Sequence, residues 1–168
     1  RGHLDGLELA DSLIWDAHKM LRTSVLAAAV LVRDARDLDG AFREEASYLF
    51  HDKDQPGFDF LHRTVECTKA ALGLKIFAAL AAEGERGMAA FVERQTDLAR
   101  TAAAWLRAQP GISVAVEPET SIVCFRLDGD DALQLEIRKR LTARGEHYIS
   151  TTEAKGRRWL RLAFMNPA

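Results

Sequence analysis

The stretch SLIWDAHKML, residues 12–21, decides how the rest of the chain is organised. It opens with a short apolar run, Leu13–Trp15, typical of a buried strand, and continues into a polar triplet that ends in Lys19. A second apolar run, Val25–Val32, follows after a short gap. Burial at the end of a strand disfavours the ammonium form of a lysine and favours the neutral amine, which is the nucleophile that forms Schiff bases with aldehydes. The spacing alone also fits an ordinary turn lysine whose ammonium group reaches water.

The composition excludes several classes of function. The chain has 168 residues, of which 48% are hydrophobic and 29% charged, as in ordinary globular proteins. Its formal net charge of -2 gives no basic surface for nucleic acid. No apolar run approaches the roughly 20 residues that span a bilayer. We therefore expect neither nucleic acid nor a membrane as a partner.

The two cysteines predict neither a disulfide framework nor a metal site. Cys67 and Cys124 have no second cysteine or histidine at the spacing of metal ligands. Each lies in an apolar stretch, which is typical of a buried, reduced thiol. Because thiols stay reduced in reducing compartments, we expect a cytoplasmic location and no bound metal.

The central part of the chain has helical periodicity. A short amphipathic turn or helix is expected over 37–45 and a loop over 52–59. Apolar residues at helical spacing predict a helix from about Arg63 to Gly84, where glycine provides a C-terminal stop. A second helix, from 86 to 108, carries one apolar stripe that includes Trp105 and is expected to lie in the core.

The last third of the chain alternates strands and a helix. Strands are predicted over 112–116, 121–127, 147–152 and 159–164, and a helix precedes Gly145. Lys155-Gly156 is a plausible hairpin turn between the last two strands. Alternation places Leu160 and Leu162 on one face of the last strand and Arg161 on the other. We place a domain boundary near Gly84, which separates residues 1–84 from residues 85–168.

Four segments resemble one family in its own order. DAHKML at 16–21, preceded by ADS at 10–12, resembles the cofactor-lysine motif of the pyridoxal-phosphate (PLP)-dependent group II amino-acid decarboxylases. That family includes glutamate, aromatic amino-acid and diaminobutyrate decarboxylases. The other three segments that resemble it are Ala46–Phe50, Thr64–Cys67 leading to Leu74-Lys75, and Trp159–Pro167.

The resemblance implies an architecture. It implies the α/β fold of the PLP-dependent transferases of fold type I, which is aspartate aminotransferase-like. Residues 1–84 would form the latter part of the large PLP-binding domain, and residues 85–168 would form a truncated small C-terminal α+β domain. Family members are dimers with sites at the subunit interface, so a homodimer with shared active sites is expected. The chain would then be a piece of a longer polypeptide.

The resemblance also implies the site. Lys19 would form the internal aldimine with pyridoxal 5'-phosphate. His18 would donate a hydrogen bond to the cofactor phosphate, and Asp16 would orient His18 or a backbone amide. Ser12 is either a residue that supports the cofactor site or a plain strand residue. Arg161 would bind the substrate carboxylate, with a salt bridge across the domain interface as the alternative.

The implied reaction is the decarboxylation of an L-amino acid to its amine and carbon dioxide. Two alternatives stay open from the sequence. One keeps the cofactor but breaks a different bond, as in an aminotransferase, a lyase or an aldehyde-forming variant. The other is a catalytically silent homologue or scaffold. The sequence does not identify the substrate.

Overall fold

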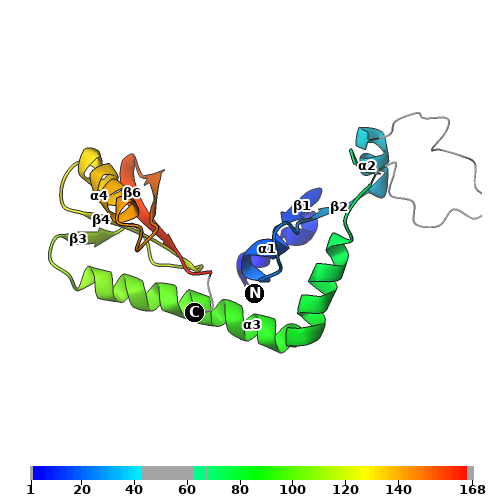
Figure 1. Ribbon diagram of the computed structural model, residues 1–168, viewed down its shortest axis with the longest axis horizontal. Helices are drawn as coiled ribbons and strands as arrows, with labels where there is room; N and C mark the ends of the chain where they lie inside the picture. Colours follow the sequence, from blue (N-terminus) through cyan, green and yellow to red (C-terminus); the bar gives the residue numbers. More distant parts are fainter. Residues whose placement is uncertain (1, 43–62, 67, 166–168) are drawn as a thin grey trace, which may run out of the picture. The chain divides into compact units, whose positions relative to one another are not determined.

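The computed structural model describes residues 2–42, 63–66 and 68–165 of the chain. The expected motif Ala46–Phe50 therefore lies outside the described residues. The chain divides into two compact units, Arg1–Ala82 and Glu83–Ala168, which are coloured from blue to green and from green to red in Figure 1.

Unit 1 contains a small antiparallel sheet and several short helices. In chain order its elements before the long helix are η1 (Gly2–Leu4), η2 (Leu7–Leu9), β1 (Ser12–Trp15), α1 (Ala17–Met20), β2 (Ala29–Val32) and α2 (Ala35–Phe42). β1 and β2 pair in a register that places Ser12 opposite Val32 and Trp15 opposite Ala29. The predicted first strand and the short helix after the sheet are therefore present.

The predicted burial of these strands is wrong. Ile14 is 71% exposed, and Val30 and Leu31 are exposed as well. β2 also begins only at Ala29, so the first half of the apolar run is not strand. Strands this apolar are normally buried by other elements that pack on them. The described residues of unit 1 are too few to cover both faces of a two-stranded sheet.

The long helix α3 (Leu72–Arg107) is interrupted at Gly84. There φ is 66° and ψ is 171°, a backbone conformation that glycine adopts without steric cost. The predicted helix stop at this glycine is confirmed, but the helix begins at Leu72 rather than near Arg63. The predicted apolar stripe is too wide, because Trp105 is 63% exposed.

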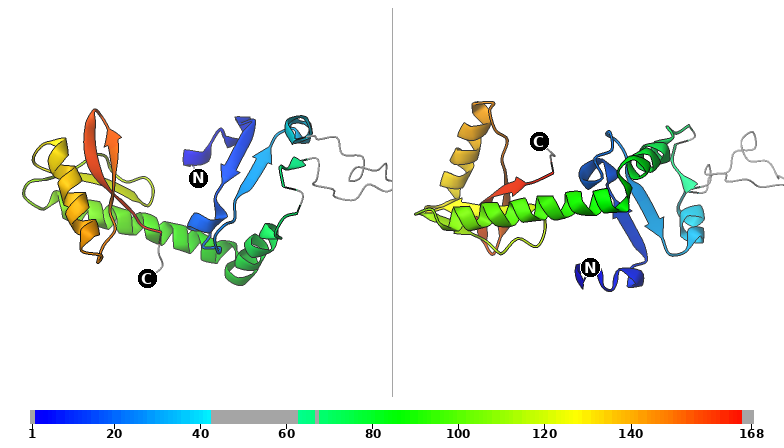
Figure 2. Two further views of the ribbon diagram at one scale, coloured as in Figure 1. Left: turned by 45° about the horizontal axis from the view of Figure 1, so that its top comes forward. Right: turned by 90° about the horizontal axis from the view of Figure 1, so that it is seen from below.

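Unit 2 is a four-stranded antiparallel sheet with helical cover. Beyond α3 its elements are β3 (Ile112–Val114), β4 (Ile122–Leu127), α4 (Asp131–Ala143), β5 (Ser150–Ala154) and β6 (Arg157–Ala163). The strand order is β3-β4-β6-β5. α4 runs alongside the β5–β6 hairpin (Figure 2). All four predicted strands and the helix between them are present, with ends that differ by a few residues.

The core of unit 2 lies on one face of this sheet. It contains Val123, Phe125 and Leu160 of the strands and Ile149, which directly precedes β5, and these residues pack with Ala99, Ala103 and Leu106 of α3. Ile137 and Leu141 of α4 pack against the same cluster, so both helices cover the same face. The predicted alternation along β6 is confirmed, because Leu160 and Leu162 face this core and Arg161 points to the opposite face.

The hairpin turn at Lys155-Gly156 is also confirmed. Both residues have positive φ, 53° and 68°, as a type I′ turn requires. The left-handed conformation is unusual for a lysine. The Nζ of Lys155 donates to the carbonyl oxygen of Ala115 at 3.0 Å, which ties this turn to the segment after β3.

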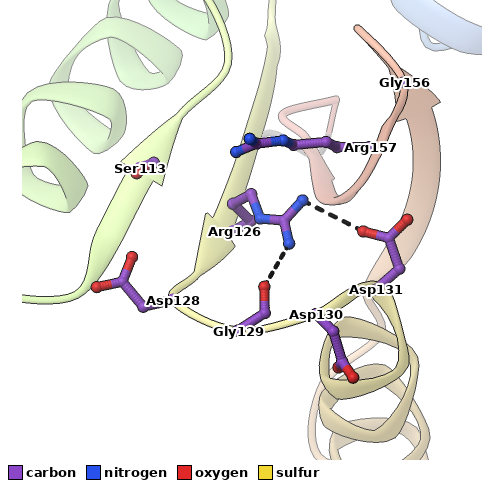
Figure 3. A pocket seen from close by; sticks show the side chains of 8 residues that line it. All are labelled: Ser113, Arg126, Asp128, Gly129, Asp130, Asp131, Gly156 and Arg157. Carbon is purple, nitrogen blue, oxygen red and sulfur yellow. Dashed lines mark hydrogen bonds and ion pairs between the residues drawn. The ribbon is translucent and has the colours of Figure 1, made fainter.

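Two buried polar side chains hold the junction between β4 and α4. Gln134 accepts from the amide of Leu127 at 3.1 Å and donates to its carbonyl at 2.9 Å. The guanidinium of Arg126 donates to the carbonyl of Gly129 at 2.6 Å and to the carboxylate of Asp131 at 3.2 Å (Figure 3). The arginine that lines the pocket drawn there therefore already donates from both of its terminal nitrogens to the protein.

Candidate functional site

The turn that carries Lys19 is built on α1. Asp16 leaves β1 in an extended conformation, and the amide of Lys19 donates to its carbonyl at 3.1 Å. Ala17 and Leu21 are buried and hold the turn against the rest of the unit. Since a helix rotates by about 100° per residue, fixing Ala17 inward turns the next two side chains away from it.

Lys19 is not buried, contrary to the sequence-based expectation. Its side chain is 54% exposed, and its Nζ forms an ion pair with a carboxylate oxygen of Asp16. The reason is the same as for the strands: an apolar neighbourhood in the sequence does not by itself supply the atoms that exclude water. Lys19 is therefore an accessible amine beside a carboxylate.

The carboxylate of Asp16 is tuned by this contact. The hydrogen bond from Lys19 holds the pKa of Asp16 below its usual value of 3.8, and the charges of Lys19 and His18 act in the same direction. Partial desolvation opposes them. The side-chain partner of Asp16 in this structure is Lys19, whereas the sequence suggested His18 or a backbone amide.

His18 is fixed by the backbone of Ala27, which the sequence did not indicate. The amide of His18 donates to the carbonyl of Ala27 at 3.0 Å, and its ring Nδ1 lies 2.9 Å from the same oxygen. The amide of Ala27 also lies 3.3 Å from Nδ1, but one nitrogen cannot donate and accept at once. The shorter contact favours a proton on Nδ1, which leaves Nε2 as the nitrogen available to a ligand.

The other two predicted site residues belong to other elements of the structure. Ser12 is exposed at the far end of β1, three residues of extended chain, or about 10 Å, from Trp15. Arg161 belongs to unit 2, where it lies opposite Cys124 on the face of the sheet that the helices leave uncovered. The structure thus groups Asp16, His18 and Lys19 on one turn.

Cys124 shares its surroundings with Arg161. Burial raises the pKa of the Cys124 thiol above its ordinary value of 9.0, and the positive charge of Arg161 acts in the opposite direction. The hydroxyl of Ser150, from the neighbouring strand, donates to the carbonyl of Arg161 at 3.2 Å. This hydrogen bond engages the backbone carbonyl of Arg161 and not its side chain.

The described part of the chain contains neither a cluster of metal ligands nor a helix suited to a membrane. Residues 2–42, 63–66 and 68–165 hold no group of three or more histidine, cysteine or acidic side chains placed to bind a metal ion. None of the helices in these ranges combines the length and the apolarity that a membrane crossing requires.

Comparison with known proteins identifies the family to which the chain is similar. The family model described as "Pyridoxal-dependent decarboxylase conserved domain" matches residues 1–128. The aromatic-L-amino-acid decarboxylase of Cavia porcellus is 30% identical over 149 residues, which cover 87% of this chain and 31% of that protein. The L-2,4-diaminobutyrate decarboxylase of Acinetobacter baumannii is 27% identical over an alignment covering 99% of this chain and 34% of that protein.

A solved structure agrees with the sequence relatives. The crystal structure of Oryza sativa TDC with PLP and tryptamine matches with a TM-score of 0.86 at 25% identity, covering 96% of this chain and 36% of that one. This likeness confirms the predicted α/β fold. The chain spans about a third of the length of the relatives that it matches. The family match extends over most of the sequence, and the chain belongs to the pyridoxal-dependent decarboxylase family.

Proposed function

We propose that the protein containing this chain decarboxylates an L-amino acid with pyridoxal 5'-phosphate, and that Lys19 is the residue bonded to the cofactor. The observation that carries the proposal is the pairing on α1 of an accessible lysine amine with an imidazole whose Nδ1 is held by Ala27. Family membership supports the reaction class, and the structure of this turn supports the choice of residues.

The donor set of α1 fits the cofactor. PLP presents an aldehyde and a phosphate, and the turn offers a primary amine and an imidazole nitrogen next to each other in sequence. With Nδ1 held by the backbone of Ala27, His18 would hold the cofactor phosphate through a hydrogen bond from Nε2. Asp16 does not suit a phosphate dianion, so its role is to accept a hydrogen bond from the amine of Lys19.

The bound cofactor supplies an electron sink for the pair left when the bond between Cα and the carboxylate breaks. The chain's own residues bind and orient. Lys19 must lose a proton to act as a nucleophile, and Asp16 lies beside the Nζ that carries it. His18 would hold the phosphate end of the cofactor and so help to orient it.

Arg161 and Ser12 complete the proposed set of residues. The guanidinium of Arg161 presents paired N–H donors that match a carboxylate, and we propose that it binds the α-carboxylate of the substrate. Arg161→Lys keeps the charge but loses the paired donors, so the KM should rise at least severalfold; an unchanged KM and kcat would exclude this role. Ser12 is proposed only to support the cofactor site, and an unchanged cofactor affinity in Ser12→Ala would remove it.

The larger organisation follows from the same proposal. Unit 1 would be the latter part of the large cofactor-binding domain, and unit 2 would belong to the small α+β domain. We further propose a homodimer with shared active sites and a cytoplasmic location. Sedimentation of the full-length protein at several concentrations tests the dimer, because a monomer at all of them contradicts it. Cell fractionation tests the location.

The deciding experiment uses the full-length protein with a panel of L-amino acids. We expect one of them to yield carbon dioxide and the matching amine in equal amounts, and borohydride to fix the cofactor on Lys19. Lys19→Ala should lose multiple turnovers, whereas Lys69→Ala, at an exposed lysine of unit 1, should behave as the parent protein. Sustained turnover by Lys19→Ala contradicts the assignment of the lysine. An aldehyde or a keto acid as the main product contradicts simple decarboxylation.

A further inference from the structure

Lys75, on the first turn of α3, contacts the loop that joins α1 to β2. Its Nζ lies 3.4 Å from the carbonyl oxygen of Ser24 and 3.3 Å from that of Val25. The side chain is half-buried, and among the described residues it forms no ion pair with a carboxylate. The ammonium group is therefore directed at two backbone carbonyls, a use that its three N–H donors allow.

This loop also carries the backbone that fixes His18. Ala27 follows Val25 closely in the chain, is fully buried and bonds both the amide and the ring of His18. A continuous set of contacts thus runs from Lys75 through the loop to His18, next to Lys19. All of it lies within unit 1.

We infer that Lys75 is a positioning residue for the cofactor site, acting through the loop and Ala27 on the orientation of His18. This inference rests on the proposed function, because His18 matters here as a ligand of the phosphate. Hydrogen bonds from a charged donor are stronger than neutral ones, and two carbonyls fixed by one ammonium group restrict the loop on both sides of a peptide bond. Without that restraint the loop samples more conformations, and the imidazole is aligned for a smaller part of the time.

The first measurement needs no cofactor and no turnover. Amide hydrogen exchange on the full-length apo protein should be faster at His18 and Ala27 in Lys75→Met than in the parent protein. Lys75→Arg should restore slow exchange, because a guanidinium offers two N–H groups to two carbonyls. Lys69→Met, which removes an exposed lysine from the same unit, is the matched control and should leave exchange unchanged.

The second measurement is the equilibrium affinity for PLP, followed by the absorbance of the bound cofactor. Lys75→Met should weaken binding by about tenfold, the range expected for a lost charged hydrogen bond. In a His18→Ala background the same substitution should change the affinity less than about twofold, because the group through which it acts is gone.

The outcomes separate the inference from the proposed function. Unchanged exchange at His18 and Ala27, or an equal loss of affinity with and without His18, overturns the role of Lys75. Lys19→Ala measured in parallel tests the function itself, since borohydride-fixed cofactor in that variant would overturn the proposed function whatever Lys75 does. If Lys19→Ala no longer retains cofactor after borohydride treatment but Lys75→Met behaves as the parent protein, the inference about Lys75 is overturned and the proposed function is not.

Discussion

The two units treat their apolar residues in opposite ways. In unit 2, strand residues such as Leu160 and Val123 are buried against two helices. In unit 1, the equally apolar β1 and β2 leave Ile14, Val30 and Leu31 exposed. The difference shows that unit 2 supplies its own core, whereas the strands beside Lys19 need a surface that the described residues of unit 1 do not provide.

The largest expected effect tests this difference directly. Leu160→Ala should lower the free energy of unfolding of unit 2 by about 2–5 kcal/mol, because it leaves a cavity in a packed core. Ile14→Ala, at an exposed position, should change the free energy of unfolding of the chain by less than about 0.5 kcal/mol. Urea unfolding of the 168-residue chain, followed by circular dichroism, measures both. Equal effects would mean that the two units do not differ in this respect.

A smaller effect concerns the buried polar junction of unit 2. Gln134→Leu keeps the volume but leaves the amide and carbonyl of Leu127 without their side-chain partner, which should cost about 1–3 kcal/mol. Gln109→Leu is the control, because Gln109 makes an exposed hydrogen bond to the carbonyl of Trp105 and should change stability by less than about 0.5 kcal/mol. If the two substitutions cost the same, the junction does not depend on Gln134.

The smallest expected effect is the acid response of unit 1. The pKa of Asp16 is lower in the folded chain than its usual value of 3.8, so its stabilising contribution is present above pH 3.8 and is lost as the pH falls through the folded value. Because the pair with Lys19 is exposed, the change in stability should be small. An NMR titration should give a midpoint below 3.8 for Asp16 that moves toward 3.8 in Lys19→Met. An unshifted midpoint in that variant would exclude Lys19 as the cause.

Most elements could be predicted from the sequence because periodicity is local. The strands of unit 2, the Lys155-Gly156 turn and the helix stop at Gly84 all follow from residues near one another in the chain. Burial in unit 1 could not be predicted in this way, since it depends on what lies over β1 and β2. The start of α3 also differs from the prediction, because the helix begins at Leu72 although apolar residues at helical spacing precede it.

The same distinction between local and long-range information applies to the candidate site. Lys19 and His18 were identified from a contiguous motif, and the structure places them on one turn with Asp16. The contacts of Ala27 with His18 and of Lys75 with the loop could not be predicted, because each joins residues distant in the sequence and no local pattern points to it. Lys19 is exposed rather than buried, because the described residues of unit 1 do not cover it or the strand that precedes it.

The register of β4 and β6 places Cys124 opposite Arg161, so the thiol should report whether a carboxylate binds Arg161 as proposed. Since the positive charge of Arg161 lowers the pKa of the thiol that lies opposite it, an anion bound to Arg161 cancels that influence and raises the thiol pKa. Alkylation of Cys124 should then slow as a carboxylate ligand is added, at a pH where thiolate is the reactive form. The rate of Cys124 alkylation would therefore measure how much ligand is bound at Arg161, even when no reaction takes place at Lys19.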